Sequence, residues 1–237
     1  MISCSHSGAI TRARLMMSTL GNFGTNTSPP CISPADTGRV VEMLLSARHP
    51  VMIAGQGVRS SRAFEEVEEL ASLIGIPVAT SFLGKSALRE THDCALGTMG
   101  AIGQKMANDT ITGADLILAV GSALSPDNTK WLSPDFIDPQ RQKIIQIDID
   151  SRNAGWTFPV ELGVTSDAKL ALQAIIQGIR DKGVPFDVEA RIEDLRKAKL
   201  EARCFDEEIV SSDATPIAPE RVVQEVGAVI EEDDLLV

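Results

Sequence analysis

Apolar residues are distributed along this chain in two alternating patterns, short continuous runs and longer stretches in which they recur every three or four positions. A continuous apolar run is typical of a strand that is buried on both faces of a parallel sheet. Such runs lie at 50–54, 76–80, 116–120 and 143–148, and a further segment at 160–164 is strand-like. The helical spacing between them predicts helices near 36–47, 61–74, 101–112 and 167–180. This alternation predicts an α/β fold with a doubly wound, mostly parallel sheet flanked by helices.

The same patterns divide the chain into four parts. Residues 1–35 are predicted to be a largely disordered leader and linker, because 18–34 is rich in Ser, Thr, Asn, Gly and Pro. Residues 36–182 hold the predicted domain, and 183–215 a charged connecting helix, over about 187–208, and a linker. From 216 to 237 a new unit is predicted to begin, with Pro219 at the first helical position and a strand starting at 235. We expect this last unit to be truncated.

Charge and cysteine content narrow the possible functions. A formal net charge of −11 and the lack of any basic run argue against binding to a nucleic-acid backbone. The four cysteines form no CxxC pair, so neither a zinc site nor a disulfide framework is indicated, and a cytoplasmic location is expected. No apolar run approaches the roughly 20 residues that a membrane-spanning helix needs, so no membrane partner is expected.

The strongest local signal is a glycine turn, Gly55-Gln56-Gly57, between a predicted strand and a predicted helix. In Rossmann-like sheets this is where a ligand's phosphate meets backbone N–H groups. The third glycine of a dinucleotide fingerprint would fall at Ser60, and the next strand ends without an acidic residue, which disfavours a nicotinamide cofactor. A tight structural turn explains the glycines equally well.

Other polar and glycine residues follow the later strands. They are the segment from Gly97 to Gly100, the pair Gly121-Ser122, and Asp148, whose carboxylate could accept hydrogen bonds from a ribose or an adenine. A nucleotide-shaped cleft and a set of ordinary strand-end turns both remain open. The acidic run 65–69 is predicted to be a solvated helix face, and no histidine pattern, nucleophile elbow, P-loop or zinc motif indicates a catalytic centre.

Three long segments, taken in order, resemble the central domain of thiamine diphosphate-dependent enzymes such as acetolactate synthase. The resemblance spans about Asp36 to Ile179. It rests on PVMIAGQGV, on IPVATSFLGK followed by LGTMG, on ADLILAVG, and on IQIDID followed by a DAKLAL helix. Each segment is weakly specific alone, and their order makes the resemblance specific.

The resemblance implies a parent enzyme with a pyrimidine-binding domain before this one and a diphosphate-binding domain after it. That parent would hold thiamine diphosphate and Mg2+ and would decarboxylate a 2-oxo acid. The family's GDG motif does not occur in this sequence, so neither cofactor is expected in this chain, which should be inactive alone. The implied partners are the remaining domains of the parent and further copies in a homo-oligomer. The alternative is a stand-alone module that binds FAD, ADP or NAD.

In some members of this family the central domain binds FAD or an adenine nucleotide. The residues that match the FAD-contacting segments are Gly55, Gln56, Gly57, Thr80, Ser81, Phe82, Gly97, Met99, Gly100, Gly121, Asp148 and Asp167. The chain departs from the FAD-using pattern after the ADLILAVG strand. Arginines are expected there, whereas this sequence has Ser122 to Asn128 without a basic residue.

Overall fold

The structure, a computed structural model, describes residues 28–202 and 207–231. The chain divides into two units, Met1–Pro30 and Cys31–Val237, and the helices and strands described below belong to the second. Most of the predicted leader and the predicted strand from residue 235 therefore lie outside the described residues.

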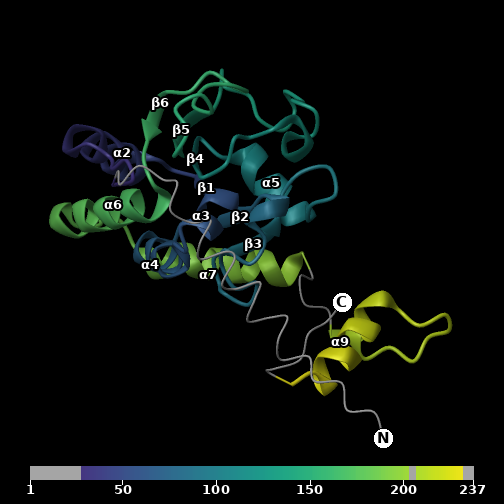
Figure 1. Cartoon of the computed structure of the whole chain (residues 1–237). Helices are drawn as coiled ribbons and strands as arrows, with labels where there is room; N and C mark the ends of the chain where they lie inside the picture. Colours follow the sequence, from purple (N-terminus) through teal and green to yellow (C-terminus); the bar gives the residue numbers. More distant parts are fainter. Residues whose placement is uncertain (1–27, 203–206, 232–237) are drawn as a thin grey trace, which may run out of the picture. The chain divides into compact units, whose positions relative to one another are not determined.

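Six parallel strands form one sheet in the order β3-β2-β1-β4-β5-β6 (Figure 1). The strands are β1 (Pro50–Ala54), β2 (Val78–Thr80), β3 (Ala95–Thr98), β4 (Leu116–Val120), β5 (Lys143–Asp148) and β6 (Leu162–Thr165). The chain runs from β1 outward to β3, then returns to the other side of β1 and continues to β6. The predicted doubly wound parallel sheet is confirmed.

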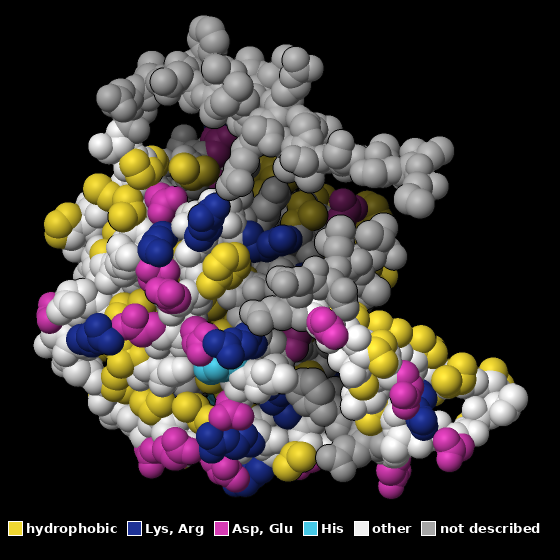
Figure 2. Space-filling model, turned by 60° about the horizontal axis from the view of Figure 1, so that its bottom comes forward, with side chains coloured by type: hydrophobic (Ala, Val, Ile, Leu, Met, Phe, Trp, Pro, Cys, Tyr) yellow, Lys and Arg dark blue, Asp and Glu magenta, His cyan; other side chains and the backbone are white. Residues whose placement is uncertain are grey.

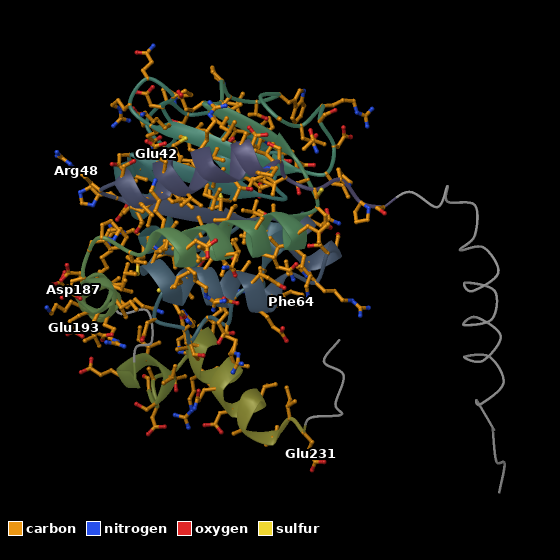
Figure 3. All side chains as sticks on the ribbon, turned by 90° about the vertical axis from the view of Figure 1, so that its left-hand side faces the viewer. Glu42, Arg48, Phe64, Asp187, Glu193 and Glu231 are labelled. Atoms are coloured by element: carbon orange, nitrogen blue, oxygen red, sulfur yellow. The ribbon has the colours of Figure 1, made fainter. Side chains whose placement is uncertain are left out.

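Helices cover both faces of this sheet. One face carries α2 (Pro34–Ser46), α4 (Phe64–Ile74) and α6 (Ala168–Lys182), and Figure 3 shows α6 packed between the other two. The other face carries α5 (Lys105–Gly113) and buried side chains of the long segment between β4 and β5. Successive residues of β1 alternate between the two cores, because side chains of a strand point to opposite faces. Strands β1, β2 and β4 are thus buried on both faces, as their continuous apolar runs predicted, whereas alternate residues of the edge strand β6 are exposed.

Two strand predictions need correction. Strand β3 was not predicted, because its four residues include Gly97, at a φ of +84°, and its register against β2 shifts at Val78. Strand β2 begins at Val78 and not at Ile76, since Pro77 has no N–H to donate to a neighbouring strand. In both places hydrogen bonds between strands determine where the strand begins and ends. The apolar pattern of a single segment does not show these hydrogen bonds.

Three predicted helix starts also move. The first helix begins at Pro34 and not near residue 36, because Ser33 caps it with a hydroxyl that accepts from the Asp36 N–H. The glycine turn opens directly into a short helix, α3 (Gln56–Ser60), and Arg62, at a φ of +54°, separates it from α4. Helix α5 starts at Lys105, because Gly100 and Gly103 form a turn before it.

Glu66 is buried, contrary to the prediction that the acidic run 65–69 is solvated. Its Oε1 accepts from Gln173 Nε2 at 2.8 Å and lies 3.3 Å from Lys169 Nζ, both on α6. The face of α4 that turns toward α6 therefore includes one carboxylate, which needs a cation and an amide from the neighbouring helix to be buried.

The predicted charged helix is shorter than expected. Helix α7 (Val188–Glu201) is capped by Asp187 and binds the segment before β3, where Arg196 pairs with Asp93 and Lys199 donates to the His92 carbonyl. Helices α8 (Glu207–Val210) and α9 (Pro219–Val229) follow, and α9 has Pro219 at its start, as predicted. The proposed domain boundaries at 183 and 216 stay predictions. Within the described residues, no helix has the length and apolar character to cross a membrane.

Candidate functional site

A cleft of about 430 Å³ opens at the carboxyl edge of the sheet, where the strand order reverses between β1 and β4. Its walls come from α3, from the ends of β4 and β5, and from the start of α6. In open α/β sheets the strands on either side of a reversal lead away in opposite directions and leave a crevice for a ligand. The volume lies within the range of about 300–1,000 Å³ that is typical of small-molecule sites.

Gly57 and Gly121 form the floor of the cleft, and together with Gly55 they bring two backbones into direct contact. Gly57 N–H donates to the Gly121 carbonyl and Gly55 N–H to the Val120 carbonyl, both at 2.9 Å. A Cβ at Gly57 would lie 2.6 Å from Gly121 Cα, and one at Gly55 would lie 2.2 Å from the Gly121 oxygen. These glycines are therefore needed for close packing between the ends of β1 and β4.

Gln146 holds the loop that forms one wall of the cleft. Gln146 is 1% exposed, and the residues directly before and after it in β5 are apolar. Its Nε2 donates to the Ser122 carbonyl and its Oε1 accepts from the Gly155 N–H, both at 3.0 Å. One buried amide thus fixes the segment after β4 against the segment after β5.

We expect Gln146→Leu to lower the free energy of unfolding by about 3 kcal/mol, because the Ser122 carbonyl and the Gly155 N–H would lose their partner. Chemical denaturation measures this directly. The matched control is Gln177→Leu, on the exposed side of α6, where Gln177 bonds Asp181; its effect should stay within about 0.5 kcal/mol. Equal effects of the two substitutions would contradict this role for Gln146.

Two carboxylates line the cleft, and each is partly engaged with the backbone. Asp148 Oδ1 accepts from the Asp150 N–H at 2.9 Å and from Asn153 Nδ2 at 3.1 Å. Asp167 caps α6, with its Oδ1 accepting from the Leu170 N–H at 3.1 Å. Beside them, hydrogen bonds from Arg152 lower the pKa of Asp150 to about 2 and keep this carboxylate ionised at neutral pH.

The twelve residues predicted from the resemblance are only partly brought together. Six line the cleft, namely Gln56, Gly57, Ser81, Gly121, Asp148 and Asp167. Phe82 and Met99 line an adjoining hollow of about 280 Å³, which shares Leu83, Ser125 and Asn128 with the cleft. Four others do not line the cleft: Gly55 and Thr80 lie at the ends of β1 and β2, Gly97 packs against Gln104, and Gly100 is hydrogen-bonded to Asn108.

Sequence reasoning did not predict most of the neutral polar lining. It consists of hydroxyl and amide side chains from loops and helix starts, namely Ser60, Ser61, Ser122, Ser125, Asn128, Asn153 and Ser166. Of these, Ser122 was noted beside Gly121, and Ser166 could have been found by its place between β6 and the Asp167 cap. The others have no periodic pattern, because the loops that carry them are placed by the whole sheet.

A serine and a histidine outside the cleft lie close together but cannot act as a catalytic pair. Ser72 Oγ is 3.2 Å from His92 Nε2, while His92 Nδ1 accepts from the Cys94 N–H. Because Nδ1 accepts, the neutral ring carries its proton on Nε2 and cannot take one from Ser72. Burial raises the pKa of the Cys94 thiol to about 11, so Cys94 is not an activated nucleophile either.

The surface offers little to a polyanion on the face drawn in Figure 2, where Lys and Arg are interspersed with Asp and Glu. Across the described ranges, no three His, Cys, Asp or Glu side chains are grouped as a metal site requires. The cleft is therefore the candidate functional site of the described domain. Glycines form its floor, and hydroxyl, amide and carboxylate side chains line it.

Fold and cleft together define a doubly wound, Rossmann-like α/β domain. Residues 37–175 match the family described as the thiamine pyrophosphate enzyme central domain. The chain belongs to this family, which confirms the resemblance seen in the sequence.

Individual relatives agree with this assignment. The chain is 31% identical over 213 residues to a probable acetolactate synthase large subunit of Methanococcus aeolicus, covering 85% of this chain and 34% of that protein. It is 36% identical over 143 residues to a sulfoacetaldehyde acetyltransferase of Alcaligenes xylosoxydans xylosoxydans, covering 60% and 23%. It is 25% identical over 199 residues to a glyoxylate carboligase of Escherichia coli O157:H7, covering 84% and 33%. The chain thus spans about a third or less of the length of these relatives.

Proposed function

We propose that this chain is the central part of a larger thiamine diphosphate-dependent enzyme that decarboxylates a 2-oxo acid and transfers the remaining fragment to an acceptor. The observation that carries the proposal is the family match over residues 37–175, on a sheet with the doubly wound order. The names of the relatives, a synthase, an acetyltransferase and a carboligase, support a reaction that joins or transfers carbon fragments. A stand-alone nucleotide-binding module is not favoured, because the matching segment is a minor part of each of these longer proteins.

Other parts of the parent enzyme would hold thiamine diphosphate and Mg2+. When bound there, thiamine diphosphate supplies the carbanion that accepts and releases the acyl fragment. The side chains of this domain would not contact the reacting atoms. Their part is to hold the fold and to form the cleft.

We propose that the cleft is a site for an adenine nucleotide, FAD or ADP, and that the twelve residues of the resemblance include its ligand contacts. The six that line the cleft are the stronger candidates. Asp148 and Asp167 would accept hydrogen bonds from ribose hydroxyls or from the adenine amino group. The serines and asparagines around them supply both donors and acceptors.

We also propose that the parent works in the cytoplasm as a homo-oligomer. Cys31 and Cys94 are both free thiols, which suits a reducing compartment. Several large apolar side chains near the cleft are exposed, among them Phe82 at 61% and Ile102 at 82%, and such side chains are commonly covered by other domains or subunits.

A thermal-shift titration with FAD, ADP, NAD and coenzyme A tests the cleft. A ligand that binds the folded state at about 100 times its Kd stabilises it by about 2.7 kcal/mol, which should raise the Tm by roughly 5–10 °C. Inorganic diphosphate is the control for an effect of charge alone. If none of the adenine compounds shifts the Tm, the cleft is not a nucleotide site.

A further inference from the structure

The charged groups that line the cleft are all negative. Among the residues that the structure describes, its lining includes the carboxylates of Asp148 and Asp167 and no Lys, Arg or His side chain. Asp148 is largely buried, and its Oδ1 is held by the Asp150 N–H and by Asn153. A diphosphate that entered this lining would meet two carboxylates and no cation to balance its charge.

The cations next to the lining are mostly directed elsewhere. Arg59 Nη1 donates to the Leu83 carbonyl at 3.2 Å, Arg152 pairs with Asp150, and Lys169 lies 3.3 Å from Glu66. Arg62 is exposed beside Ser61 and does not line the cleft. Among the described cations beside the lining, Arg62 is therefore the one for which we test an approach to a ligand from the rim.

The start of α6 is also poorly suited to a phosphate. A helix N-terminus attracts an anion through its free N–H groups and its dipole. At α6 the carboxylate of Asp167 already binds one of these N–H groups, because it accepts from the Leu170 N–H. A phosphate at this helix would therefore meet a carboxylate beside the remaining N–H groups.

What the lining does offer suits an uncharged, hydroxyl-rich ligand. Carboxylates accept hydrogen bonds from ribose hydroxyls and exocyclic amines, and the serine and asparagine side chains can both donate and accept. We infer that the cleft recognises a nucleoside and that the diphosphate of a nucleotide contributes nothing favourable to its binding. This inference rests on the proposed function of the cleft and narrows it, because neither FAD nor ADP would be held by its diphosphate.

Calorimetric titrations of adenosine and ADP into the whole chain test the inference. When a site binds a diphosphate through charged side chains, each such hydrogen bond raises the affinity about 10- to 100-fold. Here we expect adenosine to bind as tightly as ADP or more tightly. We also expect ADP binding to stay constant or strengthen as salt is raised from about 0.05 M to about 0.5 M, since salt screens repulsion. ADP binding that is tenfold tighter than adenosine binding and weakens with salt would overturn the inference while the nucleotide site stands; no binding of either ligand would overturn both.

Three variants test which side chains determine the relative affinities for adenosine and ADP. Asp148→Asn should weaken adenosine about tenfold and ADP less, so that the ratio of the two affinities moves toward ADP. Asp181→Asn, the same charge change at the far end of α6, should leave the ratio unchanged. Arg62→Gln should leave both affinities unchanged. A selective loss of ADP binding in Arg62→Gln would show a diphosphate contact at the rim, and an unchanged ratio in Asp148→Asn would remove its carboxylate from recognition; either result contradicts the inference.

Discussion

Gly121→Ala is expected to destabilise the domain by about 3 kcal/mol. Gly121 adopts a φ of +59°, in the left-handed region that costs an alanine about 1 kcal/mol or more. The added Cβ would also lie 2.5 Å from Gly57 Cα and 2.9 Å from Gly57 N and C, where backbone atoms cannot yield as a flexible side chain can. Both costs fall on the contact that joins the ends of β1 and β4.

Gly38→Ala is the matched control for this substitution. Gly38 lies within α2, and a Cβ there would meet no atom within 4 Å. Alanine should therefore stabilise the helix by about 0.5–1 kcal/mol. Urea denaturation of the two variants and the wild type measures the expected loss of stability in Gly121→Ala and the expected gain in Gly38→Ala. If Gly121→Ala unfolds at the same urea concentration as the wild type, the two backbones do not approach each other as closely as the structure has them.

The parallel sheet was predictable because most of its strands are buried on both faces and so appear as continuous apolar runs. Four of the six strands were found in this way, and β6 was found with a small shift. Strand β3 was not found, because an edge strand with a glycine in its middle is defined by the hydrogen bonds that β2 makes with it. Helix starts were misplaced where a turn of glycines or a left-handed residue interrupts the apolar spacing, as at Arg62 and Gly103.

The position of the cleft was predictable from the sequence, but most of the polar side chains that form it were not. Glycines and aspartates that follow parallel strands indicate the carboxyl edge of a sheet, and Gly57, Gly121 and Asp148 do line the cleft. Gln146 was missed although it is the one uncharged polar residue in the strand KIIQID, because sequence does not show which backbone groups a buried amide satisfies. Glu66 was missed because its partners on α6 are more than 100 positions away along the chain.

The chain belongs to the central-domain family of thiamine pyrophosphate enzymes, and we propose that the reaction centre of its parent lies in other domains. The described residues match the central domain of the family, and the cleft they form is lined by hydroxyl, amide and carboxylate side chains, without a histidine or a cysteine. We propose that other domains of the parent hold thiamine diphosphate and Mg2+.

Calorimetric titration of thiamine diphosphate with Mg2+ into the purified chain, with carbon dioxide release from pyruvate followed in the same samples, tests this claim most directly. A full-length acetolactate synthase serves as the positive control. We predict no saturable binding of thiamine diphosphate to the chain and carbon dioxide release no higher than in the protein-free blank. Saturable, Mg2+-dependent binding, or release of carbon dioxide by the chain alone, would contradict the account.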